Sequence, residues 1–125
     1  MTTPYEEFGG PDFFEALVAD FYAGVAADPD LRPMYPEEDL GPAQRRLRMF
    51  LEQYWGGPRT YSEERGHPRL RMRHAPFDIT EHHRDVWLKH MRDALDNRAL
   101  PPELDAQMWD YLVMAANSMI NQPTN

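Results

Sequence analysis

Five histidines are the side chains of this sequence most able to do chemistry: His67, His74, His82, His83 and His90. His83 and His90 share a helical pattern in which both would face the same side, as two metal ligands do. Charged residues surround them and His82, however, which favours a solvated surface over a metal site. His67 lies between glycine and proline and is predicted to be a loop residue that hydrogen-bonds the backbone or the edge of a ligand.

His74 stands in a different setting, at the end of a short predicted helix that Pro76 would terminate. A single strong ligand beside a helix break, with the other coordination positions open, suits a haem iron held by one axial histidine. The alternative is an ordinary histidine satisfied at the surface or in the core. The sequence has no cysteine, which excludes thiolate zinc sites, iron–sulfur clusters and covalent c-type haem attachment. It also lacks the HExxH, EF-hand, Walker and GxSxG signatures.

Three aromatic residues with polar groups, Tyr22, Tyr35 and Trp87, could surround a small ligand and donate hydrogen bonds to it. The alternative is core packing in which the backbone satisfies each polar group. A flat apolar macrocycle would in turn account for the remaining large apolar side chains, which include Phe14, Phe21, Phe50, Met72, Phe77 and Met91.

Helical spacing of apolar residues predicts the elements that position these side chains. Asp12 would cap a first helix that ends at Asp28-Pro29, and tight turns would follow over residues 31–35. The remaining helices are predicted from Gly41-Pro42 to Gly56, from Pro68 to Ala75, from a Thr80 cap, and from Pro101-Pro102, with a polar loop over residues 58–70. No segment alternates with the two-residue period of a strand. The prediction is an all-α protein with one domain over residues 1–125 and a polar tail from about residue 122.

Composition and charge narrow the classes of function. The chain has 125 residues, of which 42% are apolar and 27% charged, as in a globular domain. No apolar run approaches the roughly 20 residues that span a bilayer, and no signal-peptide pattern opens the chain, so a cytoplasmic protein without membrane insertion is expected. The net charge of −8 argues against nucleic-acid binding. Residues 45–73 nevertheless carry a net charge of +5. This basic segment would suit the carboxylates of a cofactor, or simply pair with nearby acids.

Two stretches carry a family resemblance: residues 47–62 read LRMFLEQYWGGPRTYS, and residues 66–77 read GHPRLRMRHAPF. Together with FY at 21–22, YPE at 35–37 and RDVWL at 84–88, they closely resemble the group II (O-type) truncated haemoglobins of actinobacteria. The resemblance covers nearly the whole chain and implies a shortened globin, a two-over-two helical sandwich around haem b. Two features lie outside it, His82-His83 and the polar tail, and neither is expected to touch the pocket.

The resemblance also implies roles for individual residues. His74 matches the proximal iron ligand, and Tyr22, Tyr35 and Trp87 match distal ligand-binding positions. Ala43 stands where most globins place a distal histidine or glutamine. The expected haem pocket comprises Ala43, Arg46, Leu47, Phe50, Tyr61, His67, Arg71, Met72 and Phe77. Within the basic segment, the haem propionates are expected to be met by Arg46, Arg48, Tyr61, His67 and Arg71.

The function expected from these residues is reversible binding of dioxygen, and of CO, NO, and other small ligands or anions, at haem b. Trp87 would be the main anchor of the ligand because an indole N–H can only donate, and Tyr22 and Tyr35 would be secondary donors. An alternative is a redox enzyme, of NO dioxygenase or peroxidase type, that uses the same haem and a separate reductase. A third reading is a small helical interaction module without a cofactor.

Overall fold

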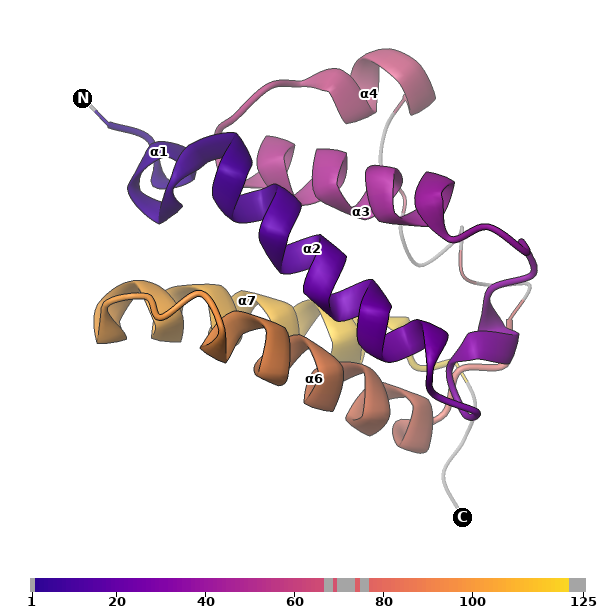
Figure 1. Ribbon diagram of the computed structural model, residues 1–125. Coiled ribbons are helices and arrows are strands. Elements are labelled where there is room, and N and C mark those ends of the chain that lie inside the picture. Colours follow the sequence, from indigo (N-terminus) through magenta and orange to yellow (C-terminus); the bar gives the residue numbers. More distant parts are fainter. Residues whose placement is uncertain (1, 67–68, 70–73, 75–76, 122–125) are drawn as a thin grey trace.

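The computed structural model describes residues 2–66, 69, 74 and 77–121, and this part of the chain forms helices and loops with no strand (Figure 1). The helices are α1 (Pro4–Phe8), α2 (Gly10–Ala26), a 3₁₀ turn η1 (Arg32–Met34), α3 (Gly41–Tyr54), α4 (Thr60–Arg65), α6 (Glu81–Asp96) and α7 (Pro102–Met119). The predicted all-α class is confirmed. None of the described helices is long and apolar enough to cross a membrane.

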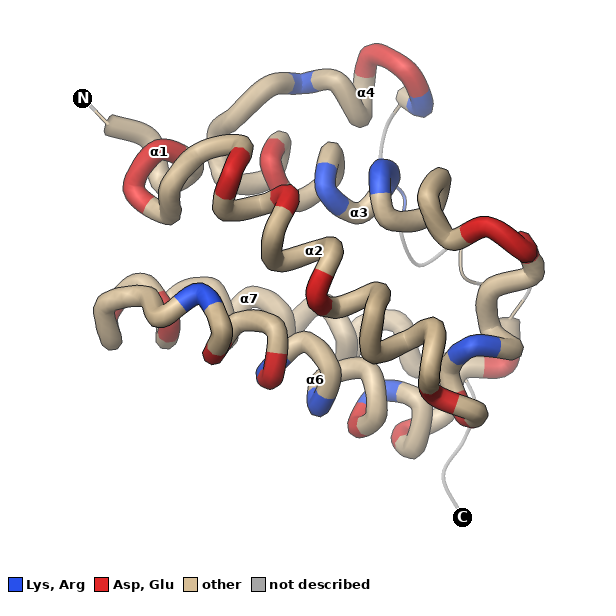
Figure 2. Tube along the Cα trace, viewed as in Figure 1, with Lys and Arg blue, Asp and Glu red and all other residues tan. Residues whose placement is uncertain are grey.

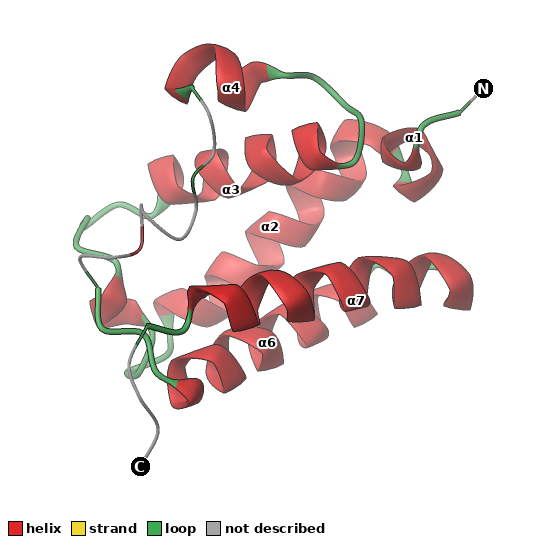
Figure 3. Ribbon diagram, turned by 180° about the vertical axis from the view of Figure 1, so that it is seen from behind, coloured by secondary structure: helices red, strands yellow, loops and turns green. Residues whose placement is uncertain are grey.

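The four long helices form two layers. Helices α2 and α3 pack against each other, α6 packs against α7, and α2 also crosses α6 to join the layers (Figures 1 and 3). The apolar stripe of α2 supplies the centre of the core, with Phe14, Leu17, Val18, Phe21 and Val25 fully buried. Burial of such side chains contributes about 1.5–3 kcal/mol each, so the α2 stripe is the main attachment between the layers. The result is the predicted two-over-two sandwich.

The structure differs from the sequence prediction at the start of α2 and in two short helices, α1 and α4, that were not predicted. Helix α2 begins at Gly10 and not after Asp12, because Gly9 caps it with a φ of 128° that only glycine adopts readily. The unpredicted α1 precedes it, capped by the Thr3 side chain, which accepts from the backbone N–H of Glu6. At five residues α1 is too short to show a helical period. Helix α4 likewise occupies part of the predicted loop over residues 58–70. Its sequence shows no apolar period because only Tyr61 is buried and its other side chains are polar.

The prediction that the histidines of α6 form a solvated face is wrong for His90. The side chain of His90 is only 14% exposed, and its Nε2 lies 2.6 Å from the Asp28 carboxylate at the end of α2. Because an ionised carboxylate only accepts, Nε2 carries the proton. His82 does lie at the surface, where it pairs with Asp30 at 2.9 Å. Together the two histidines tie the turn after α2 to α6.

We expect Gly24→Ala to lower the stability of the protein. Alanine is normally favoured over glycine inside a helix by about 1 kcal/mol. At Gly24, however, an added Cβ would lie 2.5 Å from His90 Nδ1, and the pair with Asp28 holds that ring in place. Overpacking of this kind costs roughly 1–3 kcal/mol. Urea unfolding of Gly24→Ala should show a net loss in the wild-type background and a gain in a His90→Ala background. A gain in both backgrounds would contradict this packing.

The same pair predicts a dependence of stability on pH. The hydrogen bond from His90, followed by the bond from the backbone N–H of Asp30, lowers the pKa of Asp28 below its ordinary value of 3.8. A carboxylate with a depressed pKa stabilises the fold above its unfolded-state pKa and loses that contribution as pH falls through its folded-state pKa. The difference in unfolding free energy between wild type and Asp28→Asn should therefore be constant near neutral pH and shrink below pH 3.8. A difference that vanishes already at pH 6 would refute the assignment.

Candidate functional site

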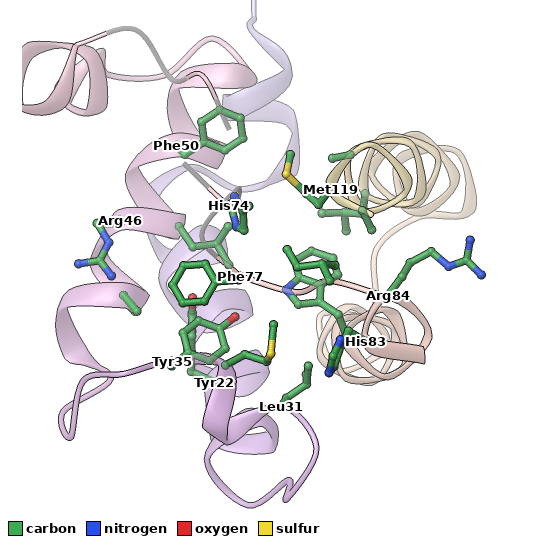
Figure 4. Close-up of a pocket in the computed structure, with 18 of the residues that line it drawn as sticks. Tyr22, Leu31, Tyr35, Arg46, Phe50, His74, Phe77, His83, Arg84 and Met119 are labelled. Carbon is green, nitrogen blue, oxygen red and sulfur yellow. The ribbon is translucent and has the colours of Figure 1, made fainter. Parts of the chain in front are cut away.

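A largely apolar cavity of about 480 Å³ lies between α3 on one side and α6 and α7 on the other, with the end of α2 closing it (Figure 4). Its volume falls within the range of small-molecule and cofactor sites, about 300–1,000 Å³. The predicted site residues that line it are Tyr22, Tyr35, Ala43, Arg46, Leu47, Phe50, Tyr61, His74, Phe77 and Trp87. The structure thus brings together residues spread over more than half of the chain. His67, Arg71 and Met72 lie outside the described residues.

His74 reaches the cavity from the segment that leads into α6. The backbone of His74 is helical, and the residue is half-buried. The N–H of Phe77 donates to the His74 carbonyl at 3.0 Å, so the chain turns immediately after the histidine. Both rings line the cavity (Figure 4). Within the described part of the chain, no group of three or more His, Asp or Glu side chains could hold a metal ion.

Tyr22, Tyr35 and Trp87 form a polar cluster inside the apolar wall. The rings of Tyr22 and Tyr35 meet edge to face at 5.5 Å. Burial, and then the neighbouring Tyr35, raises the pKa of Tyr22, so its hydroxyl keeps its proton. Burial also raises the pKa of Tyr35, against the opposing effect of hydrogen bonds from Tyr22 and Trp87. Both tyrosine hydroxyls therefore keep their protons and can donate, and the Trp87 indole N–H lies in the same cavity wall.

The lining also includes residues that sequence reasoning did not assign to it, among them the basic side chains of Arg65, His83 and Arg84. The expectation that His82-His83 would not touch the pocket is wrong for His83. The ring caps α6, with Nδ1 accepting the Thr80 backbone N–H at 3.2 Å, which keeps it at the cavity wall. Its spacing from Trp87 is the signal that would have revealed it, since residues i and i+4 share one helix face.

Only some of the described arginines of the basic segment, residues 45–73, line the cavity. Most of the described arginines of this segment lie on α3 and α4, whereas acidic side chains lie along α1, α2 and α6 (Figure 2). Arg46 lines the cavity and pairs with Glu37 at 2.9 Å. Arg48 is not among the lining residues and lies 3.4 Å from Glu52. Arg45 forms an exposed two-pronged pair with Glu64. Pairing with nearby acids therefore accounts for part of this charge.

Two helix pairs that enclose a largely apolar cavity, with His74 and His83 in its wall, have the architecture of a globin-type cofactor site. In agreement, a family model described as bacterial-like globin matches residues 3–121. The chain belongs to this family, among its group 2 truncated haemoglobins. Haem-based binding of small gas ligands such as dioxygen is the function of its class.

Individual relatives agree in sequence and in structure. The group 2 truncated haemoglobin YjbI of Bacillus subtilis is 44% identical over 122 residues, covering 98% of this chain and 91% of the relative. A thermostable haemoglobin from the actinobacterium Thermobifida fusca has a TM-score of 0.97 at 64% identity, covering 98% of this chain and 100% of that one. A truncated oxygen-avid haemoglobin from Bacillus subtilis has a TM-score of 0.90 at 42% identity, covering 96% and 100%.

Proposed function

We propose that this protein holds haem b in the cavity through His74 and binds dioxygen there reversibly. The observation that carries the proposal is the composition of the cavity wall, which combines His74, three aromatic hydrogen-bond donors and mainly apolar side chains. The second histidine of the wall, His83, has its Nδ1 occupied by the Thr80 backbone N–H. The donor set fits the group, since an imidazole is a common axial ligand of haem iron and apolar walls suit a macrocycle. Haem b is favoured over a c-type haem because the sequence has no cysteine for covalent attachment. The oxygen-avid relative supports the choice of dioxygen.

When bound, the haem supplies an iron atom at which small diatomic ligands bind. The protein would supply the polarity around such a ligand. Trp87 is the first candidate donor, because it lines the cavity and its indole N–H can only donate. Tyr22 and Tyr35 are the second, since both line the same cavity and burial raises their pKa values, so their hydroxyls keep a proton to give. Ala43 lines the cavity from α3, and its side chain has no hydrogen-bond donor, so this part of the wall is apolar.

The propionates of the haem would be met by the basic segment. Arg46 is placed for this role at the cavity wall, and Tyr61, with Arg65 beside its ring at 5.9 Å, offers a second donor. Leu47, Phe50, Met72 and Phe77 would pack on the macrocycle, and His67 and Arg71 are proposed as further partners of its edge. Charge-assisted bonds of this kind contribute about 1.5–3 kcal/mol each when well formed.

Ligand-binding and enzymatic roles can be separated by one set of kinetic measurements on the purified haem protein. The proposal predicts a dioxygen complex that forms and dissociates many times before the haem oxidises. CO and NO should bind at the same place. Rapid catalytic consumption of NO or peroxide in the presence of a reductase, with a dioxygen complex too short-lived to dissociate, would instead support the redox-enzyme alternative.

A further inference from the structure

Asn121, two residues beyond the end of α7, is bonded to the segment that carries His74. Its Oδ1 accepts the backbone N–H of Ile79 at 2.8 Å. Its Nδ2 donates to the carbonyl oxygens of Phe77 at 2.7 Å and of His74 at 3.3 Å. Its own backbone N–H donates to the Ile79 carbonyl at 3.0 Å. The side chain therefore uses its acceptor and its donor group on one short stretch of backbone.

The carbonyl of His74 is the point at which the bond from Asn121 acts on the histidine. That oxygen accepts from the Phe77 N–H, which closes the turn after the histidine, and from Asn121, which reaches it from the end of α7. The direction in which a side chain leaves the backbone follows the orientation of its own peptide groups. A bond from a distant element to this carbonyl thus limits how far the His74 backbone can rotate.

Asn121 does not itself line the cavity. Its effect on a bound group would pass through His74, just as the hydrogen-bonding partners of metal ligands orient those ligands. We propose that Asn121 is a positioning residue that fixes the His74 imidazole for its bond to iron. This inference rests on the proposed function, in which His74 holds the haem.

Two variants test it in the haem-loaded protein. Asn121→Asp keeps the acceptor for Ile79 but removes the donor to His74 and Phe77 and places a carboxylate against their oxygens. Asn121→Ala removes all side-chain bonds without adding charge. Asn117→Asp is the matched control, since it adds the same charge on α7, beside Arg84, which its side chain already contacts.

The first measurement is the iron–histidine stretching band in the resonance Raman spectrum of the reduced, ligand-free protein. The second is the rate at which haem transfers to an excess of a haem-scavenging apoglobin. Both Asn121 variants should shift or broaden the band and lose haem roughly tenfold faster, because the part-buried His74 carbonyl keeps the Phe77 N–H but loses its second donor. Asn117→Asp should match wild type in both measurements.

An unchanged band and a haem-transfer rate within about twofold of wild type in either folded variant would overturn the positioning role. Faster haem loss with an unchanged band would also overturn it, because it would show that Asn121 only stabilises the loop. A wild-type protein that binds haem but shows no iron–histidine band would contradict the proposed function itself. The two failures are therefore distinguishable.

Discussion

His74→Ala is expected to weaken haem binding by more than about 100-fold, because losing only the partners of a metal ligand already costs about 10–100-fold. Among the described histidines, His74 and His83 line the cavity. Nδ1 of His83 is engaged in capping α6, which leaves His74 as the candidate iron ligand. The measurement is a titration of each apoprotein with haem, followed by its absorption spectrum. His82→Ala, which changes an exposed histidine at the surface, is the control.

A His74→Gly variant separates the loss of the ligand from damage to the fold. Added imidazole can occupy the space of the missing side chain and restore the nitrogen ligand, so it should restore haem retention. Wild-type haem affinity and spectra in His74→Ala would show that another residue holds the haem and would contradict the assignment.

Trp87→Phe is expected to speed dioxygen release by roughly 5- to 150-fold, since a lost buried donor typically costs about 1–3 kcal/mol. CO accepts weaker hydrogen bonds and should respond less. Stopped-flow measurement of both ligands decides between this role and a purely steric one. Equal acceleration of both ligands, in binding and in release, would identify Trp87 as a steric plug. Trp109→Phe is the control, because that indole of α7 lies beneath the Arg92 guanidinium of α6 and does not line the cavity.

Hydrogen bonding from Trp87 opposes the rise in the Tyr35 pKa, and this coupling of the two side chains allows a finer test. If Trp87 acts only by holding Tyr35, then Trp87→Phe should have no further effect in a Tyr35→Phe background. If its indole donates to the ligand directly, as the sequence alone suggests, the two substitutions should have nearly additive effects on the release rate. A double-mutant cycle on the dioxygen release rate measures this coupling.

The long helices were predictable because their signals are local. The Thr80 cap of α6 and the apolar stripe of α2 can each be recognised within a few turns of sequence. Short elements such as α1 lack a period and depend on contacts made elsewhere, as when the Tyr5 N–H donates to the Trp55 carbonyl at 2.8 Å. Their existence is decided by tertiary packing, which a single sequence does not display.

The candidate site divides in the same way. The family resemblance implied its histidine and distal aromatics, and the structure brings them to one cavity. The pair between His90 and Asp28 could not be predicted, because it joins α6 to the turn after α2 through residues 62 positions apart. The bonds from Asn121 to His74 and its neighbours are equally distant along the chain, and asparagine in a polar stretch carries no signal of such a role.

The central claim is that the cavity holds one haem through His74 and that dioxygen binds there reversibly. Its most direct test is a spectroscopic titration of the protein with haem b, followed by reduction and repeated cycles of exposure to and removal of dioxygen. The account predicts saturation at one haem per chain and a dioxygen spectrum that appears and disappears with each cycle. Titration without a stoichiometric endpoint, or a reduced haem protein whose spectrum does not change with dioxygen, would contradict it.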